Sequence, residues 1–181
     1  MNETEVIATT QHWLERAVIG LNLCPFAKAA YVKQRVRFTV SRADTAEALL
    51  DDLIQALQDL HAADPADCET TLLIHPDALT DFLDYNDFLD AADAAIDALG
   101  LEGLIQVASF HPQYQFAGTA VDDIENHTNR APYPLLHLLR EDSIEKAVES
   151  YPDVDDIPRR NIETLRRLGR EGWARCLSTE T

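Results

Sequence analysis

Three short strand-like segments, separated by two helical patterns, constrain the fold of this chain more than any other feature. The candidate strands are residues 36–40, which alternate β-branched and aromatic side chains, the apolar run 70–74, and residues 104–110. Between them, residues 49–60 and 82–99 carry apolar side chains at helical spacing. Because strands that alternate with helices favour parallel crossovers, we predict an α/β fold with a mostly parallel sheet, and α+β is the alternative.

The two ends of the chain add further predicted elements. Residues 3–19 have the spacing of an amphipathic helix, and residues 135–139 are typical of a fourth strand. Two more helices are expected, one over residues 143–150 and one that begins near Pro158. The prediction is therefore a sheet of three to four strands with about five helices. With 181 residues and no linker or repeat, the chain is expected to form one domain, 1–181.

Composition excludes several classes of protein. The chain has 15 basic and 32 acidic residues and thus a net charge of −17. Because nucleic-acid binding requires clustered Lys and Arg, this charge argues against a nucleic-acid-binding protein. No apolar run reaches the length of about 18 residues that a membrane helix needs. The acidic N-terminus is unlike a signal peptide, and three cysteines without paired spacing suit a reducing compartment. We therefore expect a cytoplasmic protein with neither a nucleic-acid nor a membrane partner.

The basic residues are confined to the two ends of the chain. Residues 43–129 contain no Lys or Arg but 19 Asp and Glu. One interpretation is that these acids cover solvated helix faces and keep the protein soluble. The other is that the basic ends pack beside the acidic middle, either within one chain or across a homodimer.

Two of the predicted strands are followed by the same dipeptide. His75-Pro76 follows the strand at 70–74, and His111-Pro112 follows the strand at 104–110. If these strands are parallel, both imidazoles lie at the carboxyl edge of the sheet, where open α/β sheets bind ligands. They could then ligate a metal or act as acid and base. The alternative is that each histidine only hydrogen-bonds the backbone where its strand stops.

A cysteine lies in a loop directly before a proline. Cys24 would be a nucleophile if a histidine, a cation or a helix N-terminus lowered the pKa of its thiol. The alternative is a buried, inert thiol. Together with His75 and His111 it could form a transition-metal or haem site, since thiolate and imidazole suit zinc, copper or haem iron.

The segment after the third strand is the richest in polar chemistry. Residues 111–134 lack strand or helix periodicity but contain aromatic residues, which favours a structured loop. Arg130 and Arg140 flank its end and could grip a carboxylate or phosphate through paired hydrogen bonds. The alternative is that they form structural ion pairs that hold the loop. Three further candidate substrate-binding residues in this segment are Tyr114, Asn126 and Asn129.

Four short motifs resemble those of a known family. They are Gly20-Leu-Asn-Leu-Cys-Pro-Phe26, Phe110-His-Pro-Gln-Tyr-Gln-Phe116, Asn126-His-Thr-Asn-Arg-Ala-Pro-Tyr-Pro134 and His137-Leu-Leu-Arg140. On these motifs the chain resembles the domain-of-unknown-function family 1415, found in bacteria and plants. The resemblance covers nearly the whole chain and implies a stand-alone cytosolic protein or its organellar counterpart. It implies no activity, substrate or cofactor.

Three hypotheses about function follow from these residues. The first is a small-molecule enzyme whose substrate carries a carboxylate or phosphate, with His111 as general acid/base and Cys24 as nucleophile or ligand. In it Arg130 and Arg140 hold the anion. The second is a metal- or haem-binding protein that uses the histidine and cysteine ligands. The third is a non-catalytic module whose acidic middle docks a basic partner.

Overall fold

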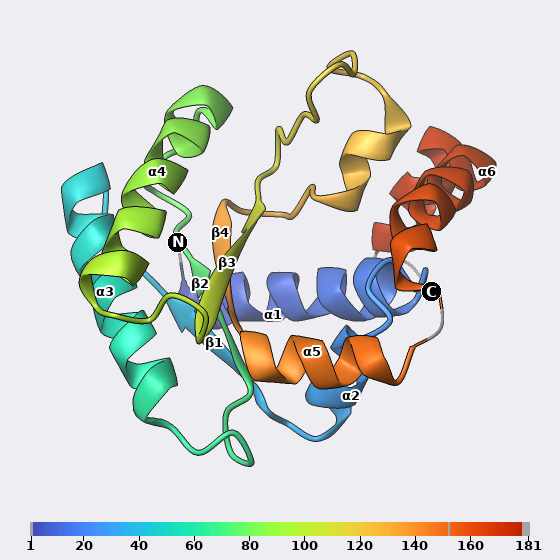
Figure 1. Cartoon of the computed structure of the whole chain (residues 1–181). Helices are drawn as coiled ribbons and strands as arrows, with labels where there is room; N and C mark the ends of the chain where they lie inside the picture. The colour runs from blue at the N-terminus through green and yellow to red at the C-terminus, as the bar shows by residue number, and fades with distance from the viewer. Residues whose placement is uncertain (1, 152, 179–181) are drawn as a thin grey trace.

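The computed structural model describes residues 2–151 and 153–178 (Figure 1). The four strands of this part of the chain are β1 (Val36–Val40), β2 (Thr70–Ile74), β3 (Ile105–Phe110) and β4 (Leu135–Arg140). Its α-helices are α1 (Glu3–Trp13), α2 (Ala27–Val32), α3 (Ala46–Ala62), α4 (Phe82–Ala98), α5 (Glu141–Glu149) and α6 (Ile157–Leu177). Shorter helical turns are η1 (Leu14–Ile19), η2 (Ile124–Thr128) and η3 (Val154–Asp156). The α/β class and a sheet of four strands are confirmed.

The pairing of the strands differs from the prediction of a mostly parallel sheet. The strand order is β1-β2-β4-β3; β1 and β2 are parallel, whereas β4 is antiparallel to both β2 and β3. Loop 111–134 leaves β3 and enters β4 at the same edge of the sheet, without a crossover. A strand that starts at the edge where the previous one ended has to run back, so β4 enters antiparallel between β2 and β3.

The sheet separates two apolar cores. On one face Leu73, Leu136 and Leu138 pack against α3 and α4. On the other face Leu72 and Ile74 pack against α1, η1 and α6. Strands β2 and β4 are interior strands and carry apolar side chains on both faces, as a sheet covered on both sides requires. Figure 1 shows the two helical layers on either side of the strands.

Local sequence explains where the helices begin. The Thr45 hydroxyl accepts a hydrogen bond from the N–H of Ala48 and so caps α3. The carboxylate of Asp81 caps α4 by accepting from the N–H groups of Leu83 and Asp84. Across the described residues, no helix is both long and apolar enough to cross a membrane.

The antiparallel insertion of β4 still leaves β1, β2 and β3 pointing the same way. The residues that follow β2 and β3 therefore lie at one edge, together with the segment that enters β4. Two backbone hydrogen bonds join them there: the N–H of His75 donates to the carbonyl of Pro134, and the N–H of His111 donates to that of Asn129. The predicted meeting of the two histidines at one edge thus occurs, although the sheet is mixed.

Candidate functional site

Both histidines at the carboxyl edge are completely buried and bind the loop between β2 and α4. The Nδ1–H of His75 donates to the carbonyl of Ala78 at 3.0 Å, and the Nε2–H of His111 donates to the carbonyl of Leu79 at 3.1 Å. Leu79 has a positive φ of 52°. The two rings thus hold a loop that contains a residue in a costly backbone conformation.

Tyr85 of α4 lies against both rings. Its ring centroid is 5.8 Å from that of His75 and 5.1 Å from that of His111. Its hydroxyl donates to the carbonyl of Leu135 and accepts from the N–H of Phe110, both at 2.9 Å. This buried network ties α4 to β3 and β4.

Burial keeps both imidazoles uncharged. It lowers the pKa of His75 to about 4, and it also lowers the pKa of His111. The Nδ1 of His111 accepts from the N–H of Gln113 at 3.0 Å, so both ring nitrogens of His111 are engaged. The Nε2 of His75 is buried without a hydrogen-bond partner among the described residues. These contacts match the alternative in which each histidine bonds the backbone where its strand ends.

Cys24 lies in the other core. It packs against the cluster formed by α1, η1 and α6, whereas the ring partner of both histidines, Tyr85, belongs to the core under α3 and α4. Burial raises the pKa of the Cys24 thiol. Within residues 2–151 and 153–178, no group of three or more His, Cys, Asp or Glu is arranged to hold a metal ion. The predicted ligand set of His75, His111 and Cys24 is therefore not assembled, because Cys24 and the histidines pack in different cores.

The two arginines predicted to share an anion lie at opposite ends of β4. Arg130 precedes β4 at the carboxyl edge, whereas Arg140 is its last residue. The guanidinium of Arg140 donates to the carbonyls of Leu60, Ala63 and Cys68. It therefore satisfies carbonyls at the C-terminal end of α3 and just beyond. A strand of six residues spans about 20 Å, so the two guanidinium groups do not form one subsite.

The predicted polar residues of loop 111–134 hold the loop itself. Asn126 is fully buried, and its Oδ1 accepts from the N–H of Phe116 and the hydroxyl of Thr119. The Nδ2 of Asn129 donates to the carbonyl of Ser109. The ring of Tyr114 packs against those of Phe82 and Phe116. The loop is therefore structured, as its aromatic content predicts.

Where this loop packs against α6, a histidine and two arginines come together. The Nδ1–H of His127 donates to the carbonyl of Ile124 at 3.1 Å, and its ring lies edge-on to that of Trp173 at 4.8 Å. The Nε2 of His127 has no hydrogen-bond partner among the described residues. Burial, followed by the charges of Arg130 and Arg170, lowers the pKa of His127. We call His127, Arg130 and Arg170 the loop–helix corner.

Both arginines of the corner are fixed by the loop. The Nε–H of Arg130 donates to the carbonyl of Tyr114 at 3.0 Å, and one of its terminal nitrogens donates to that of Val121. Arg170 donates to both the carbonyl and the carboxylate of Asp122 at 2.8 Å. Because a guanidinium carries five N–H donors, each arginine keeps donors beyond these bonds.

A second ion pair joins the same two segments. Arg166 donates to the carboxylate of Glu125 at 2.8 Å. The basic C-terminal helix, with six arginines and two glutamates, thus packs against acids from the middle of the chain. These pairs agree with the second interpretation of the charge pattern within one chain, while most of the other acids of residues 43–129 are exposed, as the first interpretation has it.

Sequence reasoning did not single out His127 or Arg170. His127 lies inside the motif Asn126–Pro134, and Arg170 lies in the basic C-terminal part of the chain, so both lie in segments that the sequence already distinguishes. What the sequence could not indicate was that these two segments are in contact.

Comparison with known proteins gives a match to a family model that covers nearly the whole chain. No curated protein and no solved structure matches it. A family model described as "Protein of unknown function (DUF1415)" matches residues 5–175, which is nearly the full length. This match agrees with the resemblance carried by the four sequence motifs, and the chain belongs to the DUF1415 family.

Proposed function

We propose that this protein is an enzyme that acts on a small carboxylate- or phosphate-bearing molecule at the loop–helix corner. In this proposal Arg130 and Arg170 hold the anion, and His127 is the general acid/base. The observation that carries it is the state of His127: its Nδ1–H is held by a carbonyl, and its Nε2 has no partner in the described part of the chain.

The tautomer of His127 suits it to proton transfer. Because Nδ1 carries the proton that it donates to Ile124, a neutral ring presents the lone pair of Nε2. Burial and the two guanidinium groups keep the pKa of the ring below its usual value, so the base is unprotonated at neutral pH. A bound anion would offset the two positive charges and make proton uptake by Nε2 easier, which couples substrate binding to base strength.

This assignment replaces two parts of the hypothesis from the sequence. The anion pair becomes Arg130 and Arg170, because Arg140 is committed to carbonyls at the far end of β4. The acid/base role passes from His111 to His127, because both nitrogens of His111 are engaged by the backbone. The cytoplasmic location and the small anionic partner remain parts of the proposal. A basic protein partner and a homodimer remain predictions.

Calorimetric titration with inorganic phosphate at constant ionic strength tests the anion site. Arg170→Ala removes one of the two guanidinium groups and should weaken binding by about tenfold or more, since a charge-assisted hydrogen bond contributes about 1.5–3 kcal/mol. Arg166→Ala is the matched control, because it breaks the other ion pair between α6 and the loop without touching the corner. Arg167→Ala, an exposed change on the same helix, controls for net charge.

We expect both controls to bind phosphate within about twofold of the unchanged protein, because neither removes a donor at the corner. Absence of saturable binding, or equal weakening by Arg166→Ala and Arg170→Ala, would show that the corner is only a structural contact between loop and helix.

A further inference from the structure

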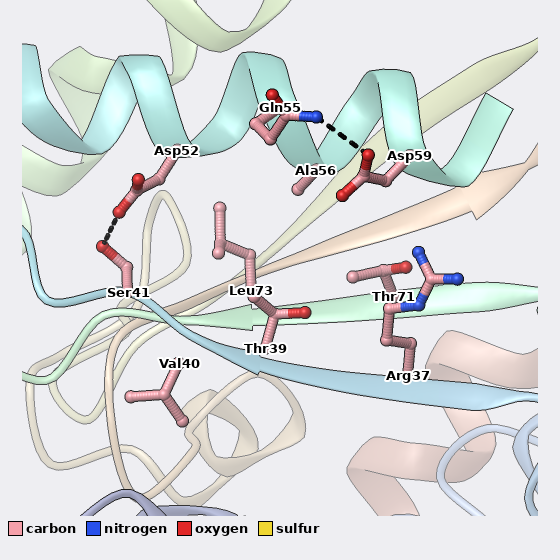
Figure 2. Close-up of a pocket in the computed structure, with 10 residues that line it drawn as sticks. All are labelled: Arg37, Thr39, Val40, Ser41, Asp52, Gln55, Ala56, Asp59, Thr71 and Leu73. Carbon is pink, nitrogen blue, oxygen red and sulfur yellow. Dashed lines mark hydrogen bonds between the residues drawn. The ribbon is translucent and has the colours of Figure 1, made fainter. Parts of the chain in front are cut away.

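A polar cavity lies between β1 and α3, on the face of the sheet opposite to α6. It has a volume of about 140 Å³ (Figure 2). Since water occupies about 30 Å³ per molecule, this is room for four or five waters or a small metabolite. The polar side chains around it are Arg37, Thr39, Ser41, Asp52, Gln55 and Asp59.

The cavity follows from the sequence of the two elements. Successive side chains of a strand point to opposite faces, so Val36 and Phe38 enter the core under α1 and α6 while Arg37 and Thr39 face α3. On α3, the apolar side chains pack toward the centre of the sheet. The polar side chains of Asp52, Gln55 and Asp59 lie above the edge strand β1. Polar side chains therefore face one another here, and they leave a space where apolar ones would interdigitate.

The two acidic side chains of the cavity, Asp52 and Asp59, each accept one hydrogen bond. The hydroxyl of Ser41 donates to Oδ2 of Asp52 at 2.6 Å. The Nε2 of Gln55 donates to Oδ1 of Asp59 at 2.8 Å, which leaves Oδ2 of Asp59 open. Both carboxylates retain lone pairs for a further donor.

Among the residues that the structure describes, Arg37 is the only cation that lines the cavity, and none of them is its partner. Its half-buried guanidinium forms no hydrogen bond or ion pair with any residue in the described ranges, although the chain carries a net charge of −17. The carboxylate of Asp59 lines the same cavity but forms no ion pair with Arg37 in the described part of the chain. Figure 2 shows Arg37 and Asp59 at one end of the cavity, with Asp52 and Ser41 at the other.

We propose that this cavity binds a small diamino acid such as ornithine. The α-carboxylate pairs with the guanidinium of Arg37, and the α-ammonium pairs with the open oxygen of Asp59. Asp52 lies seven residues, or about 10 Å, along α3 from Asp59, where it meets the side-chain ammonium. The three charged groups sum to −1, so a ligand of net charge +1 neutralises the site, whereas an acidic amino acid does not.

The site is separate from the loop–helix corner, since its residues come from β1, β2 and α3. Its ligand therefore does not depend on the function proposed above, and either proposal can fail without the other.

Calorimetric titration of the full chain with L-ornithine, and separately with L-glutamate, tests the proposal. We expect saturable binding of ornithine and at least tenfold weaker binding of glutamate. Arg37→Gln and Asp59→Asn should each weaken ornithine binding at least tenfold. Asp51→Asn, an exposed charge change on the same helix outside the cavity, should change it less than twofold.

Melting temperatures of the four proteins establish that each is folded; all the changed side chains lie at or near the surface. The proposal is overturned if ornithine does not saturate the folded protein, if glutamate binds equally well, or if Arg37→Gln and Asp51→Asn behave alike.

Discussion

The histidines of this protein differ in how many of their ring nitrogens form hydrogen bonds. His111 has both nitrogens engaged, Nε2 by the carbonyl of Leu79 and Nδ1 by the N–H of Gln113. His127 has only Nδ1 engaged by a residue that the structure describes. A ring with two committed nitrogens holds a loop, whereas a ring with one free lone pair can accept a proton.

Replacing His111 by Ala should therefore destabilise the fold. The change removes a fully buried side chain and leaves the part-buried carbonyl of Leu79 and N–H of Gln113 unpaired, at about 1 kcal/mol for each group besides the cavity that remains. We expect a loss of about 3 kcal/mol in the free energy of unfolding, measured by urea denaturation. His61→Ala, an exposed histidine at the end of α3, should change that free energy by less than about 0.5 kcal/mol. Similar curves for both variants would mean that His111 does not hold the loop.

The sequence located these histidines but not their bonds. The dipeptides His75-Pro76 and His111-Pro112 mark the ends of β2 and β3, and both rings lie at one edge because the two strands run in the same direction, which had to be assumed from the sequence. Their acceptors are carbonyls of Ala78 and Leu79, in a loop whose path depends on a left-handed residue and on the packing of α4. No local pattern encodes that path.

At the scale of secondary-structure elements, Arg140 links the end of β4 to the end of α3. The last carbonyls of a helix have no partner within it, and Arg140 supplies donors to those of Leu60 and Ala63 and to the carbonyl of Cys68. The planar guanidinium reaches three acceptors at once, which an ammonium group does not do.

Arg140→Lys should consequently cost stability although it conserves charge. We expect a loss of about 2 kcal/mol in the free energy of unfolding, since the fork of donors is lost. Arg167→Lys, at an exposed position of α6, is the control and should be neutral. Thermal or urea unfolding of the pair checks this, and full stability of Arg140→Lys would argue against a capping role.

Most of the elements were predictable because each of them has a local signal, whereas the six-residue helix α2 was not predicted. The apolar stripe of α3 and the apolar runs of β2 and β4 are periodic patterns, and caps such as Thr45 mark helix starts. The direction in which β4 pairs was not predictable from the sequence, because parallel and antiparallel pairing leave the same apolar pattern in an interior strand. Its direction depends on loop 111–134, which has no periodicity.

At the scale of the whole molecule, buried histidines link stability to pH. Burial lowers the pKa of both His75 and His137 to about 4. In the unfolded chain each titrates near 6.5, so between these values the unfolded state binds more protons than the folded one. The stabilising contribution is therefore complete above pH 6.5 and is lost as the pH falls toward 4.

We expect the free energy of unfolding to fall between pH 7 and pH 5 by roughly 2 kcal/mol for each of these histidines. Acidification also relieves repulsion among the excess acids, which acts in the opposite direction, so urea denaturation in about 0.5 M salt isolates the histidine effect. His137→Gln should make the pH dependence less steep, while His75 and the other histidines with a lowered pKa, His111 and His127, keep part of it. Stability that is constant or rises toward pH 5 would contradict the neutral state of both rings in the folded protein.

The charge distribution also organises the molecule. Arg166 and Arg170 of α6 pair with Glu125 and Asp122 of loop 111–134, so the last helix fixes the loop that carries His127. These pairs lie at the surface and contribute little to stability one by one. Their effect is on the position of the loop: they hold it against α6, with the guanidinium group of Arg170 near the imidazole of His127.

The most direct test of this account is the protonation state of His127. Long-range ¹H–¹⁵N NMR on ¹⁵N-histidine-labelled protein, assigned with His127→Gln, reports which ring nitrogen carries the proton. We predict a neutral ring at pH 7, protonated on Nδ1, with a pKa below 6.5 that rises when inorganic phosphate is added. A ring protonated on Nε2, an imidazolium at pH 7, or a pKa unmoved by phosphate would contradict an acid/base and anion-binding site at the loop–helix corner.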